Sequence, residues 1–274
     1  MTGYRNGGEG GIMISGRSDG ASEESGPGEV LGLQSAAVQG QGGRAPRPVL
    51  LILGRLAKLV LGAIAAWLAA LLVLSLLYVL LPPISTLMLA RLVTLRPVDR
   101  TVVSLREISP NLPLAVLTSE DARLCQHGGV DWEVLRDVVD AADEDGPVRG
   151  ASTIPMQVAK NLFLWPSRSY IRKGLELPIA LYLDLIWSKP RMMEIYLNVA
   201  EWGEGTFGAE AAAQRYFRKA AHDLSRREAA LLATALPNPF RRNPARPSAR
   251  HRALADRLLV RMENTAPYAG CLKT

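Results

Sequence analysis

Residues 175–200 read LELPIALYLDLIWSKPRMMEIYLNVA, and their apolar residues recur three and four positions apart. This spacing gathers apolar side chains on one side of an α-helix, whereas a half-buried strand would alternate apolar and polar residues. Pro190 stands where a first helical residue is expected, so the stretch predicts two successive helices, over 175–188 and 190–200. Pro178 lies inside the first pattern and predicts a kink there, or two shorter helices.

The same spacing recurs in other segments of the chain. It predicts further helices over 131–143, 208–217 and 225–236. Ser225 and Glu228 have the spacing of a capping box, and the LPNP sequence at 236–239 ends the last of these helices. No convincing alternating strand is found. The sequence therefore predicts a mainly α fold.

One apolar stretch is long enough to span a membrane. From Leu59 to Leu81 there are 23 residues without a charge, which suffices to cross a hydrocarbon core of about 30 Å. The stretch runs into two prolines rather than a small-residue cleavage site, so we expect a retained anchor and not a cleaved signal peptide. Its N-terminal flank is basic, with Arg44, Arg47, Arg55 and Lys58 and no acid, whereas no charge follows until Arg91. The positive-inside rule then predicts a cytoplasmic N-terminus.

Composition divides the chain into three parts. Residues 1–46 are rich in Gly, Ser and Glu, which predicts a disordered cytoplasmic tail. Residues 47–83 form the membrane anchor with its basic flank, and residues 84–274 are long enough for one domain with its own core.

The formal net charge is +6, and seven arginines stand between Arg241 and Arg261. A basic surface on a tethered domain is attracted to anionic headgroups. Because no aromatic residues interleave with these arginines, nucleic acid is not expected as a partner. The two cysteines, Cys125 and Cys271, predict neither a disulfide framework nor a metal cluster.

The stretch GASTIPMQVAKN, residues 150–161, combines a predicted turn with polar residues at helical spacing. Ser152 and Thr153 are placed to cap the following helix, and Thr153, Gln157 and Lys160 fall on one helical face. A hydroxyl, an amide and a cation near a helix start suit an anionic or polyhydroxylated ligand. A solvated helix face is the alternative interpretation.

Two further stretches carry charged residues. SEDARLCQHGGVDW, residues 119–132, holds the adjacent acids Glu120 and Asp121 followed by His127, and RSYIRKGLE, residues 168–176, adds four charged residues: Arg168, Arg172, Lys173 and Glu176. Taken singly, these are more often solvated acids, a structural histidine and an exposed ion-pair ladder. Together, two separated carboxylates and a run of cations in a membrane-anchored domain favour glycosyl chemistry on a substrate with a phosphorylated leaving group.

Five stretches of the chain resemble, in order, the successive motifs of the peptidoglycan glycosyltransferase family. They are EDARLCQHGGVD, GASTIPMQVAKNLFL, RKGLELPIALYLDLIWSKPRMMEIYLN, GAEAAAQRYF and EAALLATALPNP. The resemblance covers about residues 105–245 and implies a lysozyme-like helical domain behind one transmembrane helix. It also implies an inverting polymerase of the cell inner membrane that joins lipid II into β-1,4-linked glycan strands on the periplasmic side and releases undecaprenyl diphosphate.

The resemblance also implies roles for individual residues. It makes Glu120 the general base and Glu176 a second catalytic carboxylate. It assigns substrate binding, or support of Glu120, to eight further residues: Asp121, His127, Ser152, Thr153, Gln157, Lys160, Arg172 and Lys173. Asn198 belongs to the fourth motif, with an architectural role. By the same analogy a Mg²⁺ or Mn²⁺ ion is a candidate cofactor, although no dedicated metal cage is visible, and other proteins of wall synthesis and division are candidate partners.

The chain departs from the family pattern at Leu124, where Phe is usual, and at Pro155–Met156, where Gln is usual. Two alternative functions stay open at this point. One is a lysozyme-like hydrolase or lytic transglycosylase, and the other is a catalytically silent scaffold of wall synthesis. The cations and the retained anchor favour the polymerase over both. No Ser-x-x-Lys signature of a transpeptidase is found, which predicts a monofunctional enzyme.

Overall fold

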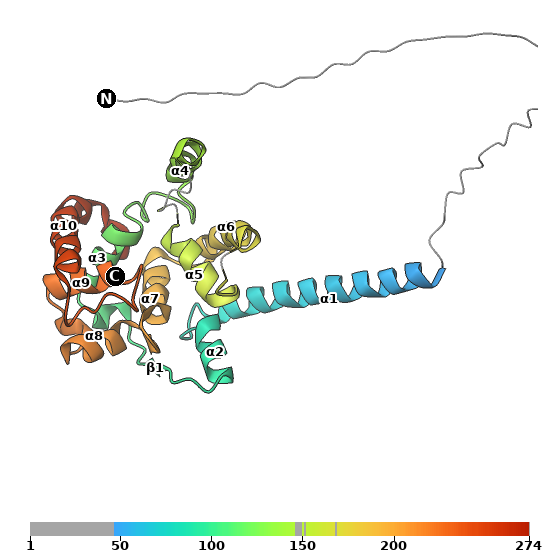
Figure 1. The fold of residues 1–274 in the computed structure, drawn as a ribbon, viewed down its shortest axis with the longest axis horizontal. Helices are drawn as coiled ribbons and strands as arrows, with labels where there is room; N and C mark the ends of the chain where they lie inside the picture. Colours follow the sequence, from blue (N-terminus) through green and yellow to red (C-terminus); the bar gives the residue numbers. More distant parts are fainter. Residues whose placement is uncertain (1–46, 146–149, 151, 168, 274) are drawn as a thin grey trace, which may run out of the picture. The chain divides into compact units, whose positions relative to one another are not determined.

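A computed structural model describes residues 47–145, 150, 152–167 and 169–273 (Figure 1). The tail 1–46, expected to be disordered, and Arg168 lie outside these described residues. In chain order the α-helices are α1 (Arg47–Leu77), α2 (Thr86–Val93), α3 (Asn111–Glu120), α4 (Trp132–Asp145), α5 (Ile154–Phe163), α6 (Tyr170–Ile186), α7 (Lys189–Val199), α8 (Ala209–Phe217), α9 (Arg226–Ala235) and α10 (Ala249–Thr265). Short 3₁₀ turns are η1 (Leu105–Glu107), η2 (Ala221–Asp223), η3 (Ala266–Tyr268) and η4 (Gly270–Leu272).

The predicted helices and their caps are confirmed. All five predicted segments coincide with helices, namely α4, α6, α7, α8 and α9. The side chain of Thr153 caps α5, and Ser225 with Glu228 forms the capping box of α9. The expectation of two shorter helices at Pro178 is wrong, because α6 is continuous from Tyr170 to Ile186. The fold class is mainly α, as predicted.

The structure contains a small sheet that the sequence did not predict. Its strands are β1 (Asp99–Arg100), β2 (Glu201–Gly203) and β3 (Thr206–Phe207), in the order β1-β3-β2. β1 pairs with β3 in parallel and β2 pairs with β3 antiparallel. Strands of two or three residues are too short to show the alternation of apolar and polar residues. The expectation that the domain has no strand was wrong for this reason.

Helix α1 holds the apolar span. Residues Leu51–Leu77 are long and apolar enough to cross a membrane by length and composition. The helix ends at Leu77, before the end of the uncharged stretch at Leu81, and hydrogen-bonded turns lead into Pro82 and Pro83. Proline disfavours helical backbone in the residue before it, so the helix is not expected to continue through Leu81.

The C-terminal part of α1 is bonded to the domain, and both belong to the unit Gly54–Thr274. The Ser75 hydroxyl lies 2.9 Å from the Tyr182 hydroxyl, and the Trp187 indole donates to the Ser75 carbonyl at 2.9 Å. These contacts join the end of the apolar helix to α6 and to the residue that follows it.

Helix α3 lies at the centre of the domain. Six of its ten residues are buried, including Leu112 and Leu117 with no exposed surface. It packs against α9 and α10, which also pack against each other (Figure 1). Leu124, where the family usually has Phe, is fully buried in the core just beyond this helix. The enclosed helix therefore fixes the position of its last residue, Glu120.

The two cysteines form a disulfide, contrary to the sequence-based expectation. Cys125 lies in the loop between α3 and α4, Cys271 lies in η4, and their Cα atoms are 5.6 Å apart. The pair is separated by 146 residues. The bond ties the end of the described chain to the loop that follows Glu120.

Candidate active site

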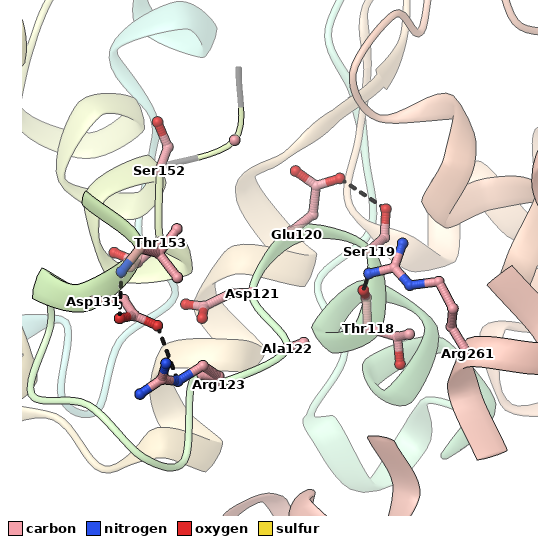
Figure 2. Close-up of a pocket in the computed structure, with 12 residues that line it drawn as sticks. Thr118, Ser119, Glu120, Asp121, Ala122, Arg123, Asp131, Ser152, Thr153 and Arg261 are labelled. Atoms are coloured by element: carbon pink, nitrogen blue, oxygen red, sulfur yellow. Dashed lines mark hydrogen bonds and ion pairs between the residues drawn. The ribbon is translucent and has the colours of Figure 1, made fainter. Parts of the chain in front are cut away.

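An open cavity of about 200 Å³ lies at the C-terminal end of α3. Figure 2 shows Glu120 inside it, with Arg261 on one side and Ser152 and Thr153 on the other. Its walls come from the end of α3 and the loop that follows, from α4 and α10, and from the segment before α5. Two of the stretches singled out in the sequence meet at this point.

Glu120 is held by a hydrogen bond to each carboxylate oxygen. Ser119 Oγ donates to Oε1 at 3.1 Å, and Gln157 Nε2 donates to Oε2 at 3.1 Å. Burial raises the pKa of Glu120, while these two hydrogen bonds and the charge of Lys160 oppose the rise. A carboxylate with a raised pKa, held in one orientation, is suited to accept a proton.

The Asp121 side chain is enclosed and bonds to α5 and to the loop after α3. It is the C-cap residue of α3, with extended φ of −162°, and its side chain is 3% exposed. Its Oδ2 accepts from the Ile154 backbone N–H at 2.8 Å, and its Oδ1 lies 2.9 Å from His127 Nε2. Asp121 thereby joins the end of α3 to the start of α5 and to the following loop.

That loop is fixed at further points. Thr153 Oγ1 donates to the Gly129 carbonyl at 2.6 Å, and Lys189 Nζ donates to the His127 carbonyl at 2.7 Å. Gly129 has φ of +84°, and a Cβ there would lie 2.7 Å from the Ala180 carbonyl oxygen. Only glycine fits this backbone conformation and this close approach without strain.

The predicted cations gather around Glu176, which is 3% exposed. Arg172 donates to Glu176 Oε1, and Lys173 donates to Oε2 at 2.9 Å. Lys173 also donates to Ser152 Oγ at 2.6 Å, which joins α6 to the turn before α5. Both oxygens of the second carboxylate are thus engaged with cations, so Glu176 orients Arg172 and Lys173.

Lys160 stands between the two carboxylates. Burial lowers its pKa, Arg172 and Lys173 lower it further, and Glu176 and Glu120 oppose the shift. Within the described ranges its ammonium has no hydrogen-bonding partner. Because Lys160 follows Gln157 by three positions on α5, the helix brings this cation to the face that holds Glu120.

Three contributors were missed by sequence reasoning. Tyr196 donates to Gln157 Oε1 at 3.1 Å, which turns the amide nitrogen of Gln157 toward Glu120. Ser119 binds Glu120 directly, and Arg261 of α10 lines the cavity and donates to the Thr118 carbonyl at 2.7 Å. Arg261 is 143 residues from Thr118, and no local pattern marks such a contact.

Asn198 of the fourth motif connects the sheet region to α7. Its side chain accepts from the Val103 N–H at 3.1 Å and donates to the Val103 and Glu194 carbonyls at 2.9 and 2.8 Å. It is buried, and its contacts are all with backbone groups. This geometry is architectural.

The described residues around Glu120 and Glu176 do not build a metal site of their own. Among the described residues there is no group of three or more His, Cys, Asp or Glu side chains placed to hold an ion. Glu176, the second predicted carboxylate, has both oxygens bound to cations. The donor set thus does not fit the Mg²⁺ or Mn²⁺ considered from the sequence.

Comparison with known proteins agrees with the family resemblance of the sequence motifs. The family described as Transglycosylase matches residues 88–263. The chain is 55% identical over 190 residues to the biosynthetic peptidoglycan transglycosylase of Agrobacterium fabrum, covering 69% of this chain and 84% of that one.

The proteins of the same name from Brucella suis and Rhodospirillum centenum are each 51% identical, over 191 and 194 residues. Each match covers 70% of this chain, with 85% and 84% of the respective relative. The matched region contains every residue of the cavity and of the cation cluster described above, so this chain belongs to the transglycosylase family of peptidoglycan glycosyltransferases.

Proposed function

We propose that the domain polymerises lipid II into β-1,4-linked glycan strands with Glu120 as the general base. The Glu120 carboxylate takes the proton from the sugar 4-hydroxyl of one lipid II molecule. The freed oxygen forms a bond to the anomeric carbon of the growing strand, and the bond from that carbon to the diphosphate breaks. The electron pair leaves with undecaprenyl diphosphate, and attack from the opposite face inverts the anomeric centre.

The observation that carries this proposal is the connection between base and cations through α5. Gln157 binds Glu120, and Lys160 lies one helical turn further on the same helix. Lys160 would contact the departing diphosphate as its charge develops, where preorganised cations are most effective. Arg172 and Lys173, oriented by Glu176, would complete this anion site.

Asp121 and His127 act as positioning residues in this mechanism. Both side chains are enclosed and bonded to each other, and Asp121 also holds the first backbone N–H of α5. They fix the loop after Glu120, and Thr153, whose hydroxyl is bonded to the Gly129 carbonyl, helps them to do so. We assign substrate contact to Ser152 and Gln157, and to Thr153 only through its place in the cavity wall.

A hydrolase with the same fold would have less use for the cations. Hydrolysis of a glycan strand releases no diphosphate, so neither Lys160 nor the two cations held by Glu176 would have a role in that reaction. A silent scaffold would equally lack a reason to hold a carboxylate with a raised pKa beside them.

The decisive experiment offers labelled lipid II and preformed glycan strands to the purified protein in detergent. We expect lipid II to be polymerised and the strands to remain intact. Glu120→Gln keeps the size and hydrogen bonds and should lower the rate at least about a hundredfold. Lys160→Ala should lower it by about tenfold to a thousandfold. Cleavage of strands without consumption of lipid II would overturn the proposal.

We also propose that the N-terminus is cytoplasmic and the catalytic domain periplasmic. The basic flank of the apolar helix supports this orientation. The Cys125–Cys271 disulfide supports it independently, because such bonds persist in the oxidising periplasm and are rare in the cytoplasm. A reporter that works only outside the cytoplasm should be active when it is fused after Thr274. Activity of a cytoplasmic reporter at the same position would show that the proposed orientation is wrong.

A further inference from the structure

A second cavity, of about 260 Å³, adjoins the active site. It shares two residues with the first cavity, Ser119 and Arg261. Arg242 and Arg257 add two more guanidinium groups to its lining. The described lining includes no Asp, Glu, His or Lys. The surface that leads away from Glu120 along α10 is therefore strongly cationic.

The acids of α10 do not neutralise these arginines. Asp256 pairs with Arg227 at 2.9 Å, and Glu263 pairs with Arg226 at 2.8 Å, both on α9. Within the part of the chain that the structure describes, Arg257 has no acidic partner. The arrangement directs the negative charges of α10 toward α9 and leaves positive charge at the cavity.

Two of the three guanidiniums are held by backbone carbonyls. Arg242 donates to the Thr234 carbonyl, and Arg261 donates to the Thr118 carbonyl at 2.7 Å. A guanidinium has five N–H donors, so each keeps donors for a ligand. These two anchored arginines and the exposed Arg257 bring planar N–H forks to one cavity, and such forks suit a two-oxygen anion.

Glu120 separates this arginine cavity from the cations of α5 and α6. One carboxylate oxygen faces Gln157 on the helix of Lys160, and the other faces Ser119, which lines the arginine cavity. A substrate whose reacting atoms lie at Glu120 therefore meets two separate cationic sites. The proposed mechanism uses only the site at Lys160.

We propose that the arginine cavity binds the carboxylates of the peptide stem carried by the sugars next to the reaction centre. This inference rests on the proposed function. In the proposed mechanism the departing diphosphate occupies the Lys160 site, so the anions that the growing strand offers along its length are the carboxylates of its peptides. The attacking lipid II brings a second diphosphate, and the test below separates it from the carboxylates. Arginine forks match carboxylates in pairs of parallel hydrogen bonds.

The test uses the full chain and two substrates, lipid II and lipid II with amidated stem carboxylates. Both keep the lipid and the diphosphate. Arg257→Gln removes a cavity charge from an exposed position, and Arg250→Gln is the matched control because Arg250 is exposed on α10 and does not line the cavity.

With lipid II, Arg257→Gln should raise KM about threefold to tenfold, with kcat unchanged, as expected for one partly exposed charge-assisted contact. The wild-type protein should show a similar rise with the amidated substrate, and Arg257→Gln should then add nothing. Arg250→Gln should match the wild type throughout. The effect of Arg257→Gln should also shrink in high salt.

An equal KM rise for both substrates in Arg257→Gln would overturn the inference and indicate a second diphosphate as the ligand. Unchanged KM in this variant would overturn it as well. In both cases polymerisation by the wild type would leave the proposed function standing. A wild type that consumes neither substrate would refute the proposed function itself.

Discussion

Replacing Asp121 separates its role in holding the site together from any role in chemistry. In Asp121→Ala, the Ile154 N–H and His127 Nε2 both lose their partner in an enclosed position. Each unsatisfied buried polar group costs about 1–3 kcal/mol, so the two together predict a loss of about 2–6 kcal/mol in the free energy of unfolding.

Asp121→Asn should cost less, for a specific reason. The amide oxygen can still accept from the Ile154 N–H, but the amide nitrogen must then face His127 Nε2. His127 Nε2 would then have to accept a hydrogen bond from the amide, which moves the imidazole proton to Nδ1. His127 Nδ1 is buried and has no partner among the described residues. One unsatisfied donor predicts a loss of about 1–3 kcal/mol.

Denaturant unfolding of the purified protein in detergent, followed by tryptophan fluorescence, measures both losses. Asp223→Ala is the control, because Asp223 is exposed and its removal should change stability by less than about 0.5 kcal/mol. The reasoning is refuted if Asp121→Ala is as stable as the control, or if Asp121→Asn is the less stable of the two variants.

Four other predictions concern the same region. Gly129→Ala should cost about 2 kcal/mol or more in unfolding free energy, because it combines φ of +84° with a backbone clash. Gly174→Ala is the control and should be neutral or stabilising, because a Cβ there would have no atom within 4 Å. Equal unfolding midpoints of the two variants would contradict this prediction. Cys125→Ser and Cys271→Ser should each lower stability by about 2–5 kcal/mol, and reductant should destabilise the wild type but neither variant in the same unfolding assay. Since burial raises the pKa of Glu120, its base form is lost on acidification at a higher pH than for an ordinary glutamate of pKa about 4.3, so kcat should fall early on the acidic side. The raised pKa also means that the folded state favours the neutral carboxyl. Glu120→Gln should therefore be more stable than the wild type at neutral pH, and this advantage should vanish as the pH falls below the unfolded pKa; an advantage that persists in acid would contradict the shift.

Local rules predicted the helices because their signals lie within a few residues. The cap at Thr153 and the capping box of Ser225 and Glu228 need only three or four positions to form. The short strands β1 and β3 have no such signal, since each consists of two residues and pairs with a distant segment. Their existence depends on the core that brings them together.

The site was predictable in its residue types and not in its connections. The sequence stretches indicated Glu120, Lys160 and the cations of α6 as chemistry-bearing groups. The sequence could not show that Tyr196 orients Gln157 or that Arg261 reaches the end of α3, because both contacts join segments far apart in the chain. The disulfide was missed for the same reason, as its cysteines are 146 residues apart.

These distant contacts explain how a base at a helix end is kept in place. The loop after Glu120 is attached to α5 through Asp121 and Thr153, to α7 through Lys189, and to η4 through the disulfide of Cys125. Each attachment comes from a different element, so freeing one leaves the others to restrain the loop. A general base must stay within hydrogen-bond reach of the hydroxyl it deprotonates, and small displacements lower rates steeply. The attachments therefore act on the reaction through the orientation of Glu120, although none of these side chains needs to touch the reacting atoms.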